Sequence, residues 1–169
     1  MSTSTTPTRP PPAPEGEPLD AIPILVVEDS EDDVFFLKRA LKEAKFPHPV
    51  HVAIDGRMAL EYLAGSGAYG DRARFPLPKL VFLDLKVPYK SGFEVLAWIR
   101  EHLVTNPPRV IVLSSSPEER DLAEARRLGA HAYMVKPAKP PALRDAIQSL
   151  QRTGASAAAV QEQVGGNPR

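Results

Sequence analysis

Five side chains with complementary chemistry lie at or just beyond the ends of short apolar runs: Glu28, Asp29, Asp84, Ser114 and Lys136. Three of them are carboxylates, which repel one another and have a hard divalent cation as their natural partner. Mg²⁺ takes one or two carboxylates together with phosphate oxygens. Bound Mg²⁺, an ammonium group and a hydroxyl that face one point could stabilise a phosphoryl group during transfer. These residue types therefore predict phosphoryl chemistry if the fold brings them together.

The apolar runs are typical of strands that are buried on both faces of a parallel sheet. Turn residues bound each run, most runs precede a helical pattern, and the runs span 22–27, 49–54, 79–84, 109–114 and 131–135. Right-handed crossovers then predict an α/β fold, a doubly wound (βα)5 five-stranded parallel sheet with helices on both faces. Ligands bind beyond the carboxyl ends of the strands in such sheets, which is where the five side chains are expected.

Capping patterns predict where two helices begin and end. Ser30 and Asp33 resemble a capping box at the start of the first helix. Ser116 as N-cap and Pro117 as first residue predict the start of the fourth helix, and Gly129 predicts its end.

The segment from Gly65 to Pro78 is longer than the usual connection between a helix and a strand. It has three glycines, two prolines and no periodicity. Two interpretations stay open, a partner-facing insertion and a tolerated surface loop.

Composition excludes several classes of protein. The 21 basic and 21 acidic residues balance, which argues against a nucleic-acid partner. The chain has no cysteine, so a disulfide scaffold is excluded. Apolar runs are too short to span a membrane, so no membrane partner is expected. The N-terminus lacks an export signal, and a cytoplasmic location is the default expectation.

The chain divides into three predicted parts. Residues 1–19 form a Pro-rich tail that is expected to be disordered, residues 20–152 form one domain, and residues 153–169 form a flexible C-terminal tail. Because the C-terminal tail is too short for a DNA-binding domain, we expect the output of the protein to be a binding event.

Four stretches of this domain resemble the signatures of bacterial two-component response regulator receiver domains. They are VVEDS (26–30), FLDLKVP (82–88), VLSSS (112–116) and YMVKP (133–137), and the resemblance runs from Ile22 to Leu150. It implies the flavodoxin-like receiver fold and a phosphorelay function without enzymatic turnover. The long segment before FPLPKLVFLDLKVP resembles the stand-alone receivers paired with bacterial phytochrome histidine kinases.

The resemblance also implies roles for individual residues. Asp84 would accept a phosphoryl group from a sensor histidine kinase, and Lys136 would pair with a phosphoryl oxygen. Mg²⁺ would be the cofactor: Asp29 would bind it directly and Glu28 through water, with Asp84 and the backbone carbonyl of Lys86 as further ligands.

Ser114 and Tyr133 match the hydroxyl and aromatic switch positions of the family, although an aromatic residue in a strand is also an ordinary core residue. Pro137 would follow a cis peptide bond. A homodimer is possible through the face of the fourth helix, fifth strand and fifth helix, or through the apolar side of the first helix.

Lys86 departs from the family pattern, in which a small polar residue more often stands two positions after the acceptor. Its side chain could shield the phosphoryl group and slow hydrolysis, or it could be a solvated lysine without effect.

Two other functions compete with a phosphoacceptor. A Mg²⁺-dependent aspartyl phosphatase would carry D-x-D after the first strand, where this chain has Glu28-Asp29-Ser30. A phosphorylation-independent adaptor with the same fold would usually have lost the acceptor or the lysine, and this chain retains Asp84 and Lys136.

Overall fold

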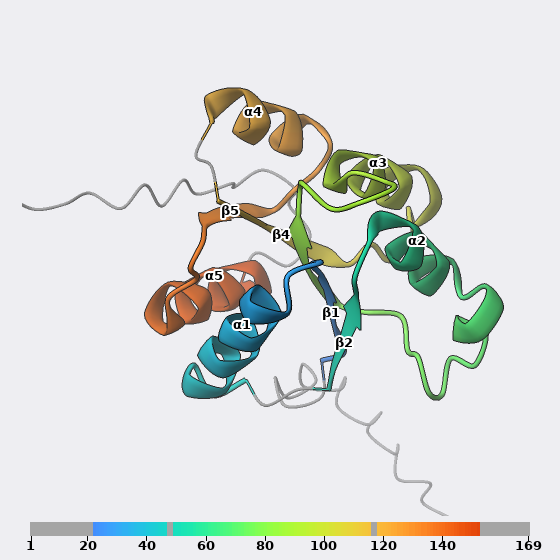
Figure 1. The fold of residues 1–169 in the computed structure, drawn as a ribbon, viewed down its shortest axis with the longest axis horizontal. Coiled ribbons are helices and arrows are strands. Elements are labelled where there is room, and N and C mark those ends of the chain that lie inside the picture. The colour runs from blue at the N-terminus through green and yellow to red at the C-terminus, as the bar shows by residue number, and fades with distance from the viewer. Residues whose placement is uncertain (1–21, 47–48, 116–117, 153–169) are drawn as a thin grey trace, which may run out of the picture.

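A computed structural model describes residues 22–46, 49–115 and 118–152 and contains one sheet of five parallel strands (Figure 1). The strand order is β2-β1-β3-β4-β5, which is the flavodoxin-like order and confirms the predicted fold. The strands are β1 (Ile24–Val27), β2 (Val50–Ala53), β3 (Leu80–Asp84), β4 (Arg109–Ser114) and β5 (Ala132–Val135). The predicted tails at 1–19 and 153–169 lie outside the described residues.

Helices cover both faces of the sheet (Figure 1). On one face, α1 (Glu31–Glu43) and α5 (Pro140–Arg152) pack on a core that includes Leu41, Phe82 and Leu143. On the other face are α2 (Gly56–Ala64), α3 (Gly92–His102) and α4 (Glu119–Arg127). Each strand therefore contributes alternate side chains to two apolar cores, which explains why the sequence shows near-continuous apolar runs.

Ser30 caps α1 as predicted, and its hydroxyl accepts a hydrogen bond from the backbone N–H of Asp33 at 3.3 Å. Ser30 and Asp33 do not form a full capping box, however. The N–H of Ser30 donates to Glu28 Oε1 instead, and the Asp33 carboxylate accepts from Lys136.

The start of α4 also differs from the prediction. The prediction that the fourth helix begins at Pro117 was wrong, because α4 begins at Glu119 after an extended N-cap at Glu118. The predicted N-cap Ser116 and Pro117 themselves lie outside the described residues. Gly129 follows the end of α4 with φ +97°, as predicted.

The segment Gly65–Pro78 is anchored to α2 and the edge strand β2. It contains a 3-10 turn, η2 (Gly67–Tyr69), and the rings of Tyr69 and Phe75 pack against Tyr62 of α2. The guanidinium of Arg72 donates hydrogen bonds to the backbone carbonyls of Tyr62, Leu63 and Phe75 at 2.8, 2.8 and 3.2 Å. A side chain on Gly65 would meet this guanidinium at 2.7–2.8 Å.

None of the helices that the structure describes combines the length and apolarity needed to span a membrane.

Candidate functional site

The predicted carboxylates meet at the carboxyl edge of the sheet. Asp84 is the last residue of β3, and Glu28 follows β1 directly. Because β1 and β3 are parallel neighbours with Val27 opposite Leu83, the residues that follow these two positions emerge side by side. The structure therefore brings together the carboxylates that the sequence placed after different strands.

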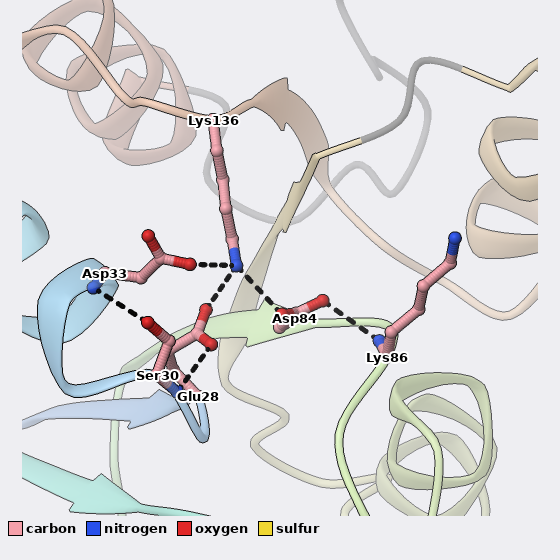
Figure 2. Close-up of polar contacts among 6 residues, drawn as sticks. All are labelled: Glu28, Ser30, Asp33, Asp84, Lys86 and Lys136. Carbon is pink, nitrogen blue, oxygen red and sulfur yellow. Dashed lines mark hydrogen bonds and ion pairs between the residues drawn. The ribbon is translucent and has the colours of Figure 1, made fainter.

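Lys136, just after β5, joins these carboxylates (Figure 2). Its ammonium group donates a hydrogen bond to Glu28 Oε2, another to Asp84 Oδ2 at 2.8 Å, and a third to Asp33 Oδ2 at 2.9 Å. An ammonium group has three N–H bonds, so these three carboxylates use all of them. The Lys136–Pro137 peptide bond is cis, as predicted.

Backbone groups orient the two buried carboxylates from the opposite side. The N–H of Ser30 donates to Glu28 Oε1 at 3.1 Å, and the N–H of Lys86 donates to Asp84 Oδ1 at 2.9 Å. Each carboxylate is thus held between a backbone amide and the Lys136 ammonium, which limits its rotation.

The local charge is strongly negative, since three carboxylates contact one ammonium group and a fourth, that of Asp29, lies close to Glu28 and Asp84. Burial raises the pKa of Glu28, and its hydrogen bond with Lys136 only partly offsets that effect. Burial alone would lower the pKa of Lys136, but hydrogen bonds with the carboxylates outweigh it and the pKa lies above its ordinary value. Lys136 is therefore firmly protonated, and the site still lacks positive charge.

A divalent cation would supply that charge. Glu28, Asp29 and Asp84 each offer a carboxylate oxygen, and these oxygens lie within 4.8 Å of one another. Asp29 is exposed while the other two are buried, so the group opens to solvent on one side. Oxygen ligands with room for water are what Mg²⁺ requires, and these residues fit it.

Ser114 and Tyr133 lie next to each other, away from solvent. Ser114 ends β4 and is 1% exposed, and Tyr133 of β5 is 6% exposed. Burial raises the pKa of the Tyr133 phenol, and a hydrogen bond with Ser114 opposes that effect. Tyr133 also packs in the core beneath α4, so this geometry suits both a switch and a core residue.

The side chain of Lys86 points away from Asp84 and Lys136 in Figure 2. It is exposed, and within the described part of the chain its ammonium group forms no ion pair. Lys86 contacts the acceptor through its backbone N–H, which donates to Asp84 Oδ1. Shielding of Asp84 by this side chain needs another rotamer and stays a prediction.

Sequence reasoning missed Asp33 as a member of the site and interpreted it only as part of a helix cap. One signal was available: Asp33 is the third residue of a helix that begins three residues after Glu28, so the first turn of α1 starts at the carboxyl edge of the sheet. Asp33 also borders a cavity of about 300 Å³ that Phe36, Lys136 and Ala138 help to line.

Comparisons with known proteins agree with this geometry. The family model of the response regulator receiver domain matches residues 24–148. The chain is 32% identical over 128 residues to the response regulator Rcp1 of Synechocystis sp., covering 76% of this chain and 85% of the relative. A solved structure of the bacteriophytochrome response regulator AtBRR is similar, with 38% identity, a TM-score of 0.68, and coverage of 80% of this chain and 96% of that one.

Two further similar structures are of a phosphorylated and of a metal-bound response regulator. One is the phosphorylated cyanobacterial phytochrome response regulator RcpA, with 31% identity, a TM-score of 0.65, and coverage of 84% of this chain and 99% of that one. The other is Rcp1 in its Mn²⁺-bound form, with 29% identity, a TM-score of 0.63, and coverage of 83% of this chain and 99% of that one.

Proposed function

The chain belongs to the response regulator receiver family, and from this we propose that it accepts a phosphoryl group on Asp84 from a histidine kinase with the help of Mg²⁺. The observation that carries the proposal is the Lys136 ammonium, which lies 2.8 Å from Asp84 Oδ2 at the edge of a three-carboxylate group. The acceptor carboxylate of Asp84, the ammonium of Lys136 and the carboxylates that could bind a metal ion meet there.

In the proposed reaction, a carboxylate oxygen of Asp84 attacks the phosphorus of a phosphohistidine. A P–O bond forms as the P–N bond breaks, and the electron pair of that bond leaves with the imidazole of the kinase. Lys136 pairs with a phosphoryl oxygen, and the backbone N–H of Lys86 holds the other carboxylate oxygen of Asp84. Bound Mg²⁺ would neutralise charge on the phosphoryl oxygens, with Glu28, Asp29 and Asp84 holding it.

We further propose a signalling role for the face formed by α4, β5 and α5. A phosphoryl group brings about 1.5 to 2 negative charges to the end of β3. The Ser114 hydroxyl would turn toward the phosphoryl group, and the neighbouring Tyr133 side chain would change its position. This movement would alter the face. The output would be phosphorylation-dependent binding, to a second copy of the chain or to another protein. Val135, 41% exposed at the end of β5, gives the face an apolar contact point.

The kinase partner is proposed to be a bacterial phytochrome. AtBRR and RcpA, which this chain resembles along most of their length, are described as phytochrome response regulators. The anchored segment Gly65–Pro78, which suggested this subfamily from the sequence, packs through Phe75 against His51 of the edge strand β2.

The deciding experiment is phosphorylation of the wild type, Asp84→Asn and Asp145→Asn by a small phosphodonor, followed by intact mass. We expect one phosphoryl group per chain for the wild type and for Asp145→Asn, an exposed control on α5, and none for Asp84→Asn or for the wild type in EDTA. Labelling of Asp84→Asn would contradict the proposal. Continuous turnover of phosphate esters without a phosphoprotein would favour the phosphatase alternative.

A further inference from the structure

Asp33 is the feature of the site that the proposed function does not use. It is the third residue of α1, and its Oδ2 accepts a hydrogen bond from the Lys136 ammonium at 2.9 Å. The contact spans 103 positions of the sequence, so only the fold creates it. Asp33 lies outside the group of carboxylates whose oxygens could hold a metal ion.

The donors of Lys136 are already fully used. Its three N–H bonds are directed to Glu28, Asp33 and Asp84, so a phosphoryl oxygen can pair with the ammonium only if one carboxylate gives up its bond. A phosphoryl group on Asp84 also places negative charge beside whichever carboxylates remain.

Asp33 is the carboxylate that can most easily give up its hydrogen bond with Lys136. Its side chain is 42% exposed, compared with 7% for Glu28 and 11% for Asp84, so water can replace the lost hydrogen bond. All three carboxylates border the same cavity of about 300 Å³, so exposure and not space distinguishes Asp33 from the other two. Glu28, in contrast, is also held by the N–H of Ser30.

We propose that Asp33 is a positioning residue that restrains Lys136 before phosphorylation and competes with the phosphoryl group for its ammonium. The proposal rests on Asp84 being the phosphoacceptor. Loss of the negative charge of Asp33 weakens its hydrogen bond with the Lys136 ammonium, so a phosphoryl oxygen displaces it more easily, and also removes one repelling charge. Both effects favour the phosphoprotein. Asp33 thus slows phosphorylation and shortens the life of the acyl phosphate.

The test compares Asp33→Asn with Asp32→Asn in the full chain. Asp32 is the exposed neighbour in the same turn of α1, so its substitution makes the same charge change without touching Lys136. With a small phosphodonor at fixed Mg²⁺, we expect Asp33→Asn to be labelled about two- to fivefold faster than the wild type, which is the upper part of the range for an exposed ion pair. Asp32→Asn should stay near the wild-type rate, and Asp33→Glu, which keeps the charge, should restore it.

A second readout does not depend on phosphorylation. In the free protein, NMR of the Lys136 ammonium group should show faster proton exchange with water in Asp33→Asn than in the wild type, and no change in Asp32→Asn. Equal labelling rates for the two Asn variants, slower labelling of Asp33→Asn, or an unchanged ammonium signal would overturn the proposal. If the wild type takes no label, the proposed function fails, and the ammonium signal still decides whether Asp33 restrains Lys136.

Discussion

Lys136 and Arg72 each make three hydrogen bonds to oxygen atoms, but their partners differ. Lys136 donates to three carboxylates at the carboxyl edge of the sheet. Arg72 donates to three neutral backbone carbonyls, two of them from the last turn of α2. A lysine ammonium is a point charge with rotating donors, whereas the arginine guanidinium is a rigid fork.

The partners determine what each cation can do. Around Lys136 the negative charge exceeds the positive charge, so an added cation or phosphoryl group can redistribute the contacts. Around Arg72 one positive charge meets the negative end of a helix dipole, because two of the three carbonyls that accept from it, those of Tyr62 and Leu63, lie in the last turn of α2. The first arrangement suits a site that changes state, and the second suits a permanent anchor.

Lys136→Met is expected to have the largest effect on stability. It leaves buried carboxylates without their counter-charge, and we expect the free energy of unfolding to fall by about 3 kcal/mol at pH 7.5 in EDTA. Mg²⁺ should then stabilise the variant more than the wild type, because no ammonium competes for the carboxylates. Urea unfolding with and without Mg²⁺ measures both quantities.

The control for this prediction is Lys90→Met, which breaks an exposed ion pair with Glu94 at 3.3 Å. We expect no measurable change in the free energy of unfolding and no dependence on Mg²⁺, because solvent screens this pair. If Mg²⁺ stabilised Lys136→Met and the wild type equally, the carboxylates around Lys136 would not be the cation site.

Arg72→Ala tests the permanent anchor. Loss of three charge-assisted hydrogen bonds to backbone carbonyls should lower the free energy of unfolding by about 2 kcal/mol. Arg72→Lys keeps the positive charge without the planar guanidinium, and it should recover only part of the lost free energy of unfolding. In urea unfolding, Mg²⁺ should not change the loss of stability caused by either Arg72 variant. A clear Mg²⁺ dependence would mean that the Arg72 region is not a permanent anchor independent of the site.

The sequence predicted these two regions unequally. Glu28, Asp84 and Lys136 were predictable because each follows an apolar run, and parallel strands bring such positions to one edge. Asp33 and Arg72 were not, because each acts through a side chain that folds back on a distant or neighbouring element. The anchoring of Gly65–Pro78 likewise depends on contacts between aromatic rings. Its glycines and prolines predict a loop and give no sign of these contacts.

His131 combines a feature of each region. Like Arg72 it is a half-buried side chain with a neutral backbone partner, but its charge can change with pH. It lies at the amino end of β5, where its Nδ1 accepts the backbone N–H of Val110 at 3.1 Å. Burial, assisted by the charge of Arg109, lowers the pKa of His131 to about 4 from an ordinary 6.5.

Protonation of His131 should therefore destabilise the fold. Because the folded pKa lies below the unfolded one, the contribution is fully present above pH 6.5 and is lost as the pH falls from 6.5 toward 4. Allowing for partial exposure, we expect the wild type to lose about 1 to 2 kcal/mol more than His131→Asn between pH 7 and pH 4.5. The Asn side chain can still accept the Val110 N–H but does not titrate, so urea unfolding of both proteins at the two pH values isolates the effect of the imidazole. An equal pH dependence would mean that His131 titrates in the folded protein as it does in the unfolded chain, and that the Nδ1 contact with Val110 does not hold the ring neutral.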